Sequence, residues 1–359
     1  MELTMPIIHR HPANPLLTAA DVPYPCSLLF NAGVAKFQGR YVMVFRNDYG
    51  AKTGEEFQER QKQGRSGFDG TNLGFAFSED GIKWEVQPKP CITLELARKY
   101  MAPLMPGRNP DVELHRFYDP RLTVLDSRLY MCFAIDTAHG LRGGVAVSDD
   151  LDHWELFSAS VPDNRNMVLF PEKIGGRYCR YERSVNTWGG LHLKDDQAMM
   201  WMSFSPDLRH WGDSRHVLST ESIPFANSKM GPGAPPVRTD KGWLTTFHAV
   251  ERDDTRGKNG WENQWPKIYR AGLMLTDLED PSRILGMCKD PLLSPQSWYE
   301  TGERGPQGEF SEGFRNHVIF PGGMILEDSG EVKIYYGAAD TVECLATADV
   351  ADLVNACLR

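Results

Sequence analysis

One acidic residue, Asp119, stands out because of the residues around it. It precedes a proline and lies between Arg116 and Arg121, in the segment His115-Arg-Phe-Tyr-Asp-Pro-Arg-Leu122. A carboxyl group beside arginines can act as a general acid or base at a reacting bond. It can equally cap a turn and pair with arginine, and the local sequence does not separate the two interpretations. The segment predicts that Asp119 lies at the entry to a strand.

Four basic residues farther along the chain form a candidate anion site. Arg165 and Arg183 flank a predicted hairpin, where two guanidinium groups would form a forked site for an oxyanion. Lys229 lies in a Gly/Pro-rich stretch, predicted to be a loop, in which the backbone can approach a ligand closely. His248 ends an apolar strand, and a lone histidine there is more often structural than a ligand. Surface arginines are also common, so these four residues alone do not establish a site.

These candidates are far apart in the sequence, and internal repeats indicate the fold that gathers them. A short apolar strand ending in Ser or Thr and then Asp occurs five times, and Trp follows in the first three copies. The spacing, about 57 to 71 residues, is close to that of a generous propeller blade. The Asp and Trp residues are interpreted as turn and packing residues of a hairpin. The copies are Leu73–Asp80, Gly144–Asp150, Met200–Asp207, Ala271–Asp277 and Cys344–Asp349.

A second series of predicted strands interleaves with the first and is rich in aromatic and β-branched residues. Together the two series predict an all-β fold, a five-bladed β-propeller with few short helices, formed by a single domain over residues 1–359. Helices are predicted at residues 56–62, 94–100 and, at the C-terminus, 350–358. A closed ring of blades has one central funnel where distant residues meet. The second series comprises Gly39–Arg46, Ser127–Phe133, Gly176–Arg183, Gly242–His248 and Glu331–Gly337.

The composition narrows the range of partners. A formal charge of −9 and a pI near 5.6 argue against nucleic acid or an anionic membrane as a partner, since either requires a basic face. Seven scattered cysteines without a Cys-x-x-Cys pair fit neither a disulfide framework nor a zinc site, so no metal is expected. The first fifteen residues lack the features of a signal peptide, and no stretch approaches 18 apolar residues. We expect a cytoplasmic protein.

Taken in order, the motifs of this chain resemble those of glycoside hydrolase family 130. Any one of them is weak, but the combination runs from about residue 15 to residue 354 and covers all five predicted blades. The sequence departs from the family pattern at Ser184 and Phe247, where many members have Pro and Tyr, and neither change removes a charge. The matching segments are Phe30–Gly33 with Arg46, Tyr118–Arg121, Asn164–Asn166 through Phe170–Ile174, Gly231–Pro236, Gly242–Leu244 with Phe247–His248, and Tyr335–Asp340.

The resemblance implies a five-bladed propeller that acts as a β-mannoside phosphorylase, with roles for ten residues. Asp119 would be the catalytic acid, and its proton would reach the glycosidic oxygen through the 3-hydroxyl of the mannose. Tyr269 is the least secure position, because an insertion, Glu251–Trp265, precedes it. The other implied roles are phosphate binding by Arg165, Arg183, Lys229, His248 and Tyr269, and substrate binding by Asn31, Arg46, Tyr118 and Asp340.

This residue set is chemically suited to inverting phosphorolysis. Phosphate is already nucleophilic, so one acid and a basic cluster suffice, whereas an inverting hydrolase needs two carboxylates and room for water. We expect inorganic phosphate as co-substrate, no other cofactor, and a β-1,4-linked mannosyl-glucose or mannooligosaccharide as substrate. The alternatives are a β-mannosidase on the same scaffold and a non-catalytic glycan- or protein-binding propeller. Acceptor and linkage depend on the predicted loops Lys52–Asp69 and Asp253–Gln264, and a homo-oligomer is compatible with the sequence.

Overall fold

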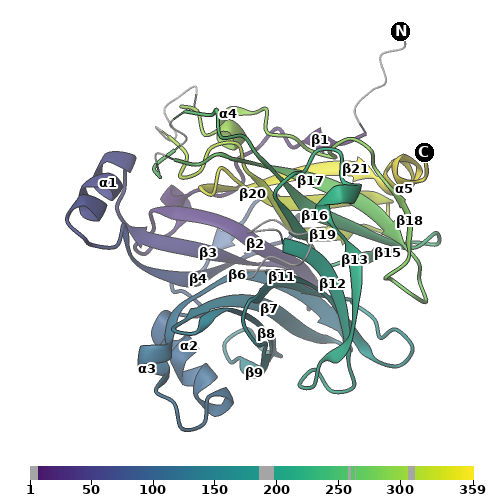
Figure 1. Cartoon of the computed structure of the whole chain (residues 1–359), viewed down its shortest axis with the longest axis horizontal. Helices are drawn as coiled ribbons and strands as arrows, with labels where there is room; N and C mark the ends of the chain where they lie inside the picture. Colours follow the sequence, from purple (N-terminus) through teal and green to yellow (C-terminus); the bar gives the residue numbers. More distant parts are fainter. Residues whose placement is uncertain (1–6, 186–197, 258–259, 263, 306–311) are drawn as a thin grey trace.

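Five antiparallel sheets follow one another along the chain in the arrangement of a five-bladed β-propeller (Figure 1). The structure, a computed structural model, describes residues 7–185, 198–257, 260–262, 264–305 and 312–359. The first blade comprises β2 (Leu28–Phe37), β3 (Arg40–Gly50), β4 (Phe68–Ser78) and β5 (Glu85–Val86). The second comprises β6 (Leu114–Leu125), β7 (Arg128–Thr137), β8 (Gly140–Ser148) and β9 (Glu155–Ala159). The third comprises β10 (Asn164–Leu169), β11 (Tyr178–Val185), β12 (Ala198–Ser205) and β13 (Gly212–Leu218).

The last two blades include one additional strand and both ends of the described chain. Strand β1 pairs with β21, so a segment near the N-terminus completes the blade that is built from the C-terminal part of the chain. The fourth blade is β14 (Lys229–Pro232), β15 (Val237–Arg238), β16 (Trp243–Arg252), β17 (Lys267–Thr276) and β18 (Ile284–Met287), and the fifth is β19 (Ile319–Leu326), β20 (Glu331–Ala338), β21 (Val342–Asp349) and β1 (His9–Arg10).

Helices are few and lie outside the sheets. Figure 1 shows α1, α2 and α3 on one side of the molecule and α5, beside the C-terminus, on the other. The three predicted helices are confirmed, and α5 has the predicted bounds. The α-helices are α1 (Gly54–Lys62), α2 (Leu94–Met101), α3 (Pro110–Glu113), α4 (Trp298–Thr301) and α5 (Val350–Leu358), with short 3-10 helices at Ala19–Asp21, Ala102–Leu104 and Thr220–Ser222.

Both predicted series of strands are confirmed, as the second strand (β3, β7, β11, β16, β20) and the third strand (β4, β8, β12, β17, β21) of each blade. The aspartates after the third strands are turn residues, as expected: Oδ1 of Asp80 accepts hydrogen bonds from the backbone amides of Ile82 and Lys83. Asp150 and Asp207 make the same pair of contacts in the next two blades.

Strand β3 illustrates why the sequences of the blade strands are continuous apolar runs. Side chains alternate between the two faces of a strand. Val42 and Val44 therefore pack in the core shared with the second blade, while Met43 and Phe45 pack in the core shared with the fifth. A strand buried on both faces has no polar side to break the pattern, and this burial fixes each blade against its neighbours.

The innermost strands of the first three blades share a local distortion. The register of β2, β6 and β10 with the next strand shifts at Asn31, Asp119 and Asn166. All three have left-handed backbone conformations, with φ of 53°, 52° and 54°. Asn and Asp adopt this conformation more readily than other residues with a side chain. The bulges therefore favour Asn and Asp, and two of the three bulge residues, Asn31 and Asp119, are candidate site residues.

Three local predictions were wrong, and the strands explain why. Asp119 lies within β6 and not at its entry, because β6 continues through the bulge. Lys229 begins a short strand, β14, and not a loop, since the Gly/Pro-rich segment pairs with β16. His248 lies in the middle of β16, which continues to Arg252.

Candidate active site

A cavity of about 160 Å³ lies where residues from all five blades meet. It is lined by eight of the ten predicted site residues: Asn31, Arg46, Tyr118, Asp119, Arg165, Arg183, Tyr269 and Asp340. A larger hollow of about 680 Å³, between the β15–β16 turn and α5, contains none of the ten. The chemistry-bearing residues therefore gather in the smaller, polar cavity.

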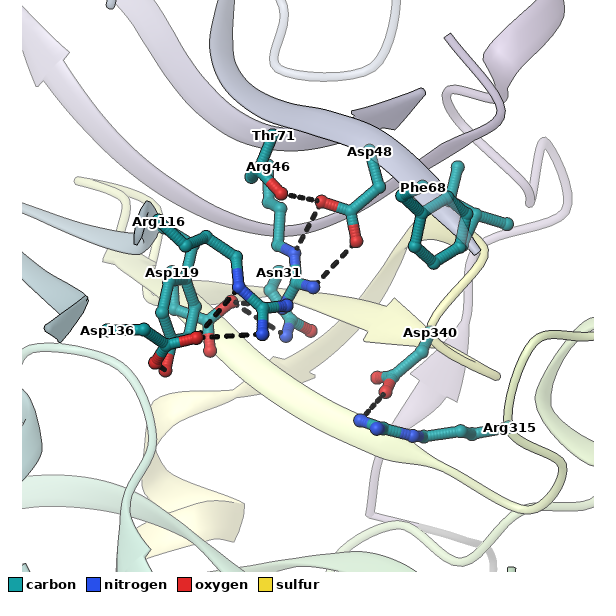
Figure 2. Close-up of polar contacts among 12 residues, drawn as sticks. Asn31, Arg46, Asp48, Phe68, Thr71, Arg116, Asp119, Asp136, Arg315 and Asp340 are labelled. Carbon is teal, nitrogen blue, oxygen red and sulfur yellow. Dashed lines mark hydrogen bonds and ion pairs between the residues drawn. The ribbon is translucent and has the colours of Figure 1, made fainter. Parts of the chain in front are cut away.

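Asp119 is held by donors from the first blade. Its Oδ1 accepts hydrogen bonds from Nδ2 of Asn31 at 3.1 Å and from Nη1 of Arg46 at 3.4 Å, as Figure 2 shows. Burial alone would raise the pKa of Asp119, but the charges of Arg46 and Arg121 and the Asn31 hydrogen bond lower it below its usual value. The carboxyl group is therefore ionised in the ligand-free protein.

Arg46 is fixed in turn by Asp48, two residues along the same strand and fully buried. Nε of Arg46 donates to Oδ1 of Asp48 at 3.0 Å, and Nη2 donates to Oδ2 at 2.6 Å. The hydroxyl of Thr71 also donates to Asp48 (Figure 2). This bidentate pair orients the remaining nitrogen of Arg46 toward Asp119.

Arg165 and Arg183 face each other across β10 and β11. They are directly opposed in the strand register, an arrangement that is unfavourable for like charges. Nη1 of Arg165 donates to the hydroxyl of Tyr118 at 2.9 Å, and neither arginine has a carboxylate partner among the described residues. Burial and the charge of Arg165 lower the pKa of Arg183 to about 9. Among the described residues, the buried Nε atoms of both arginines have no hydrogen-bond partner. Two opposed cations with unused donors can bind an anion.

The hydroxyl group of Tyr118 connects Asp136, on the second blade, with Arg165, on the third. This hydroxyl donates to Oδ1 of Asp136 at 2.6 Å and accepts from Arg165, while Arg116 pairs with the same Asp136 at 2.7 Å. Burial raises the pKa of Tyr118, so its hydroxyl stays protonated and keeps this polarity. The contact positions Arg165 without neutralising its charge.

Asp340 lies across the cavity, on the turn between β20 and β21. Nη1 of Arg315 donates to Oδ2 of Asp340 at 3.1 Å, and the same guanidinium group makes two hydrogen bonds to Glu262. Figure 2 shows Arg315 and Asp340 apart from the Asp119 group. Burial raises the pKa of Asp340 despite the opposing charges of Arg315 and Arg46. The cavity thus holds two carboxyl groups with different surroundings.

Comparison with known proteins identifies the family. The pattern of glycoside hydrolase family 130, described as beta-1,4-mannooligosaccharide phosphorylase, matches residues 22–359. The chain belongs to glycoside hydrolase family 130. It is 29% identical to a beta-1,4-mannooligosaccharide phosphorylase from Ruminococcus albus, over 97% of this chain and 90% of the relative. It is 27% identical to a 1,2-beta-oligomannan phosphorylase from a Thermoanaerobacter species, over 94% and 95% of the two chains.

The fold matches solved structures of this family. A beta-1,2-mannobiose phosphorylase from Listeria innocua superposes with a TM-score of 0.74 at 23% identity, over 98% of this chain and 99% of the other. Among the described residues, no cluster of His, Cys, Asp and Glu could hold a metal ion. None of the helices that the structure describes has both the length and the apolar character needed to cross a membrane.

Two of the residues that the family resemblance selected do not line the cavity. Lys229 and His248 are buried in β14 and β16. Nε2 of His248 lies 2.8 Å from Nη1 of Arg183, so the histidine is in contact with a cavity residue and is not itself on the surface of the cavity.

Six further residues that line this family 130 cavity were not assigned to the site from the sequence. Asn166 had a usable signal, because it occupies the same bulge position as Asn31 and Asp119 in successive blades. Trp265, in the insertion, had none, although its ring stacks on Tyr269 at 5.8 Å. The missed residues with polar side chains or aromatic rings are Arg116, Asn166, Trp265, Arg315 and Phe320.

Proposed function

We propose that this chain catalyses the inverting phosphorolysis of β-mannosides, releasing α-mannose 1-phosphate and a shortened acceptor sugar. The observation that carries the proposal is the opposed pair Arg165 and Arg183, which has buried donors to spare and no carboxylate partner among the described residues. An enzyme that used only water as nucleophile would gain nothing from this costly arrangement. Inorganic phosphate supplies the missing negative charge and is the co-substrate.

In this proposal the mannose lies between Asn31, Arg46 and Asp340, with Asp119 as the acid. The lowered pKa of Asp119 requires that its proton arrive with the substrates. After Arg46, Arg121 and Asn31, the charge of Arg165 also lowers the pKa of Asp119, so a phosphate anion bound beside Arg165 raises the pKa of the carboxyl group. Transfer through the 3-hydroxyl of the mannose fits a carboxyl group that is only 9% exposed.

Phosphate attacks the anomeric carbon from the face opposite the leaving oxygen. Arg165, Arg183 and Tyr269 would hold it in line and offset its repulsion from the carboxylates. Lys229, buried in β14, adds a positive charge that acts on His248 beside Arg183. The bond to the acceptor breaks as the bond to phosphate forms, and the proton from Asp119 goes to the departing oxygen.

We favour β-1,4-linked mannosyl-glucose or mannooligosaccharides as substrates. This choice is supported by the description of the family pattern and by the Ruminococcus relative. Relatives with β-1,2 linkages are similar to this chain at 27% identity, so an acceptor screen with mannose 1-phosphate is the direct test of linkage. The proposal treats residues 1–359 as one domain. A homo-oligomer and a cytoplasmic location stay predictions.

One observation favours a second candidate, hydrolysis. Asp340 is a second carboxyl group in the cavity, and an inverting hydrolase needs such a group as general base. However, its Oδ2 is engaged by the guanidinium group of Arg315, so it is less available to activate a water molecule. Phosphorolysis therefore accounts for more of the site.

Measuring mannose and mannose 1-phosphate separately, with and without millimolar phosphate, distinguishes the two reactions. We expect mannose 1-phosphate as the main product and little turnover of a β-mannoside without phosphate. Free mannose as the main product at saturating phosphate would contradict the assignment.

A further inference from the structure

Arg315 lies between two carboxylates, of which one lines the cavity and the other does not. Nη1 of Arg315 donates to Oδ2 of Asp340, a cavity residue, at 3.1 Å. Nε and Nη2 of the same guanidinium group donate to the two carboxylate oxygens of Glu262, at 2.8 Å and 2.9 Å. Glu262 comes from the insertion Glu251–Trp265 and lies outside the cavity lining. It can therefore act on the cavity through Arg315.

The backbone of Arg315 and the faces of its guanidinium group are held in place. The backbone amide donates to the carbonyl oxygen of Ala339, the residue before Asp340, at 3.1 Å. The guanidinium carbon lies 4.4 Å from the ring centre of Trp265 and 4.9 Å from that of Phe314. Burial lowers the pKa of Arg315, but its hydrogen bonds to Glu262 and the charge of Asp340 raise it above the usual value. The arginine therefore stays charged, and the two carboxylates determine how its nitrogens are shared.

Glu262 and Asp340 compete for this one guanidinium group. A guanidinium group binds a carboxylate most strongly through two parallel hydrogen bonds, and Glu262 has that arrangement. Asp340 receives a single bond (Figure 2), and its Oδ1 accepts no hydrogen bond from a described residue. The side chain of Asp340 is 10% exposed and that of Glu262 is 27% exposed, so solvent screens the attraction of Asp340 less. Without Glu262, Arg315 would turn to bind both oxygens of Asp340.

We propose that Glu262 is a positioning residue, which prevents Arg315 from binding both oxygens of Asp340 and so leaves Oδ1 for a hydroxyl group of the sugar. This inference rests on the proposed function, in which Asp340 lines the mannose subsite. The insertion then contributes to the affinity for the mannoside although Glu262 does not touch the sugar. Binding of phosphate is not affected, because Arg165 and Arg183 belong to the third blade.

Steady-state kinetics of Glu262 variants test the inference. Glu262→Ala should raise the KM for the mannoside about tenfold and leave the KM for phosphate within about twofold. Glu262→Gln should have a smaller effect, because its amide oxygen can still accept one hydrogen bond. Glu251→Gln is the matched control, since Glu251 begins the same insertion and pairs at 2.6 Å with Arg270, which does not line the cavity. It should change neither KM by more than about twofold. Equal changes in both KM values for Glu262→Ala, or an equal effect of the control, would overturn the proposal.

A double-mutant cycle separates an action through Arg315 from direct contact with the sugar. In an Arg315→Met background no guanidinium group remains to be restrained, so Glu262→Ala should change the KM for the mannoside by less than about twofold. Additive losses would overturn the proposal, because they would mean that Glu262 contacts the sugar itself.

A crystal structure of Glu262→Ala provides a measurement that does not depend on turnover. We expect two hydrogen bonds from Arg315 to Asp340, one to each carboxylate oxygen, where the native protein has one. A guanidinium group that keeps its single contact with Oδ2 would overturn the inference. If the chain lacks phosphorylase activity altogether, the proposed function fails, while the restraint of Arg315 by Glu262 is still decided by this structure.

Discussion

The two sides of the central cavity handle buried charge in opposite ways. On the side of the first and fifth blades, the arginines face carboxylates: Arg46 pairs with Asp48 and Asp119, and Arg315 pairs with Asp340. On the side of the third and fourth blades, Arg165 and Arg183 face each other, and their hydrogen-bond partners within the described part of the chain are neutral, Tyr118 and His248. The arginine charges of the first side are paired with carboxylates without a ligand, and those of the second side are not.

The pKa directions of Arg46 and Arg183 express the same contrast, although Tyr118 and Asp119 raise the pKa of Arg165 despite its burial. Despite burial, the charges of Asp48 and Asp119 raise the pKa of Arg46 above its usual value. Burial and the charge of Arg165 instead lower the pKa of Arg183. A neutral sugar can bind to the first side through hydrogen bonds alone, whereas the second side is stabilised by an anion. This division matches the two substrates of a phosphorolysis.

The largest expected effect is on stability and contrasts two Arg→Met substitutions. Arg46→Met leaves the carboxylate of Asp48 buried without a counter-charge, so we expect a loss of about 3–5 kcal/mol in the free energy of unfolding. Arg183→Met removes one of two opposed cations, so we expect a change within about 1 kcal/mol, or a gain. Denaturant unfolding of both variants measures the difference.

Phosphate provides the control for this pair. It should stabilise the wild-type protein and the Arg46→Met variant, but not Arg183→Met. Similar losses of stability in the two variants, with phosphate stabilising both, would mean that the two sides of the cavity do not differ in the way described.

Asp119 lies between the two sides, and its substitution tests the chemistry separately from binding. Asp119→Asn should reduce phosphorolysis by roughly two orders of magnitude or more, because the amide cannot donate the proton. The fold should persist, since Asn accepts the left-handed backbone conformation at this position. Initial rates and circular dichroism of the same preparation check both statements. A variant that keeps more than about a tenth of the wild-type rate would remove Asp119 from the acid role.

The blades could be predicted from the sequence, because burial on both faces leaves long apolar strands such as Tyr41–Phe45 and the turns repeat in each blade. The candidate site was predictable only where a repeat or a family motif marked it. The opposed register of Arg165 and Arg183 depends on a bulge, which strand propensity does not encode. Trp265 and Arg315 lie outside the repeated strands, so no periodicity identifies them.

The smallest expected effect is a shift with pH, and it concerns the arginine side alone. The titratable groups that act on Arg183 come from four other strands: Tyr118 and Asp119 on β6, Arg165 on β10, His248 on β16 and Tyr269 on β17. Burial raises the pKa of Tyr269 above its usual value of 10, so this tyrosine is still neutral when Arg183 begins to lose its proton.

Since the pKa of Arg183 is about 9, the fraction that carries a positive charge falls as the pH rises through 9. The KM for phosphate should therefore rise about tenfold for each pH unit above 9, while the KM for the mannoside changes little. In Arg165→Gln the repulsion is removed, so the rise should begin at higher pH. Lys229→Arg should leave the onset unchanged, which excludes the lysine as its cause. An onset near pH 9 that does not move in Arg165→Gln would show that the opposed arginines do not influence each other's charge.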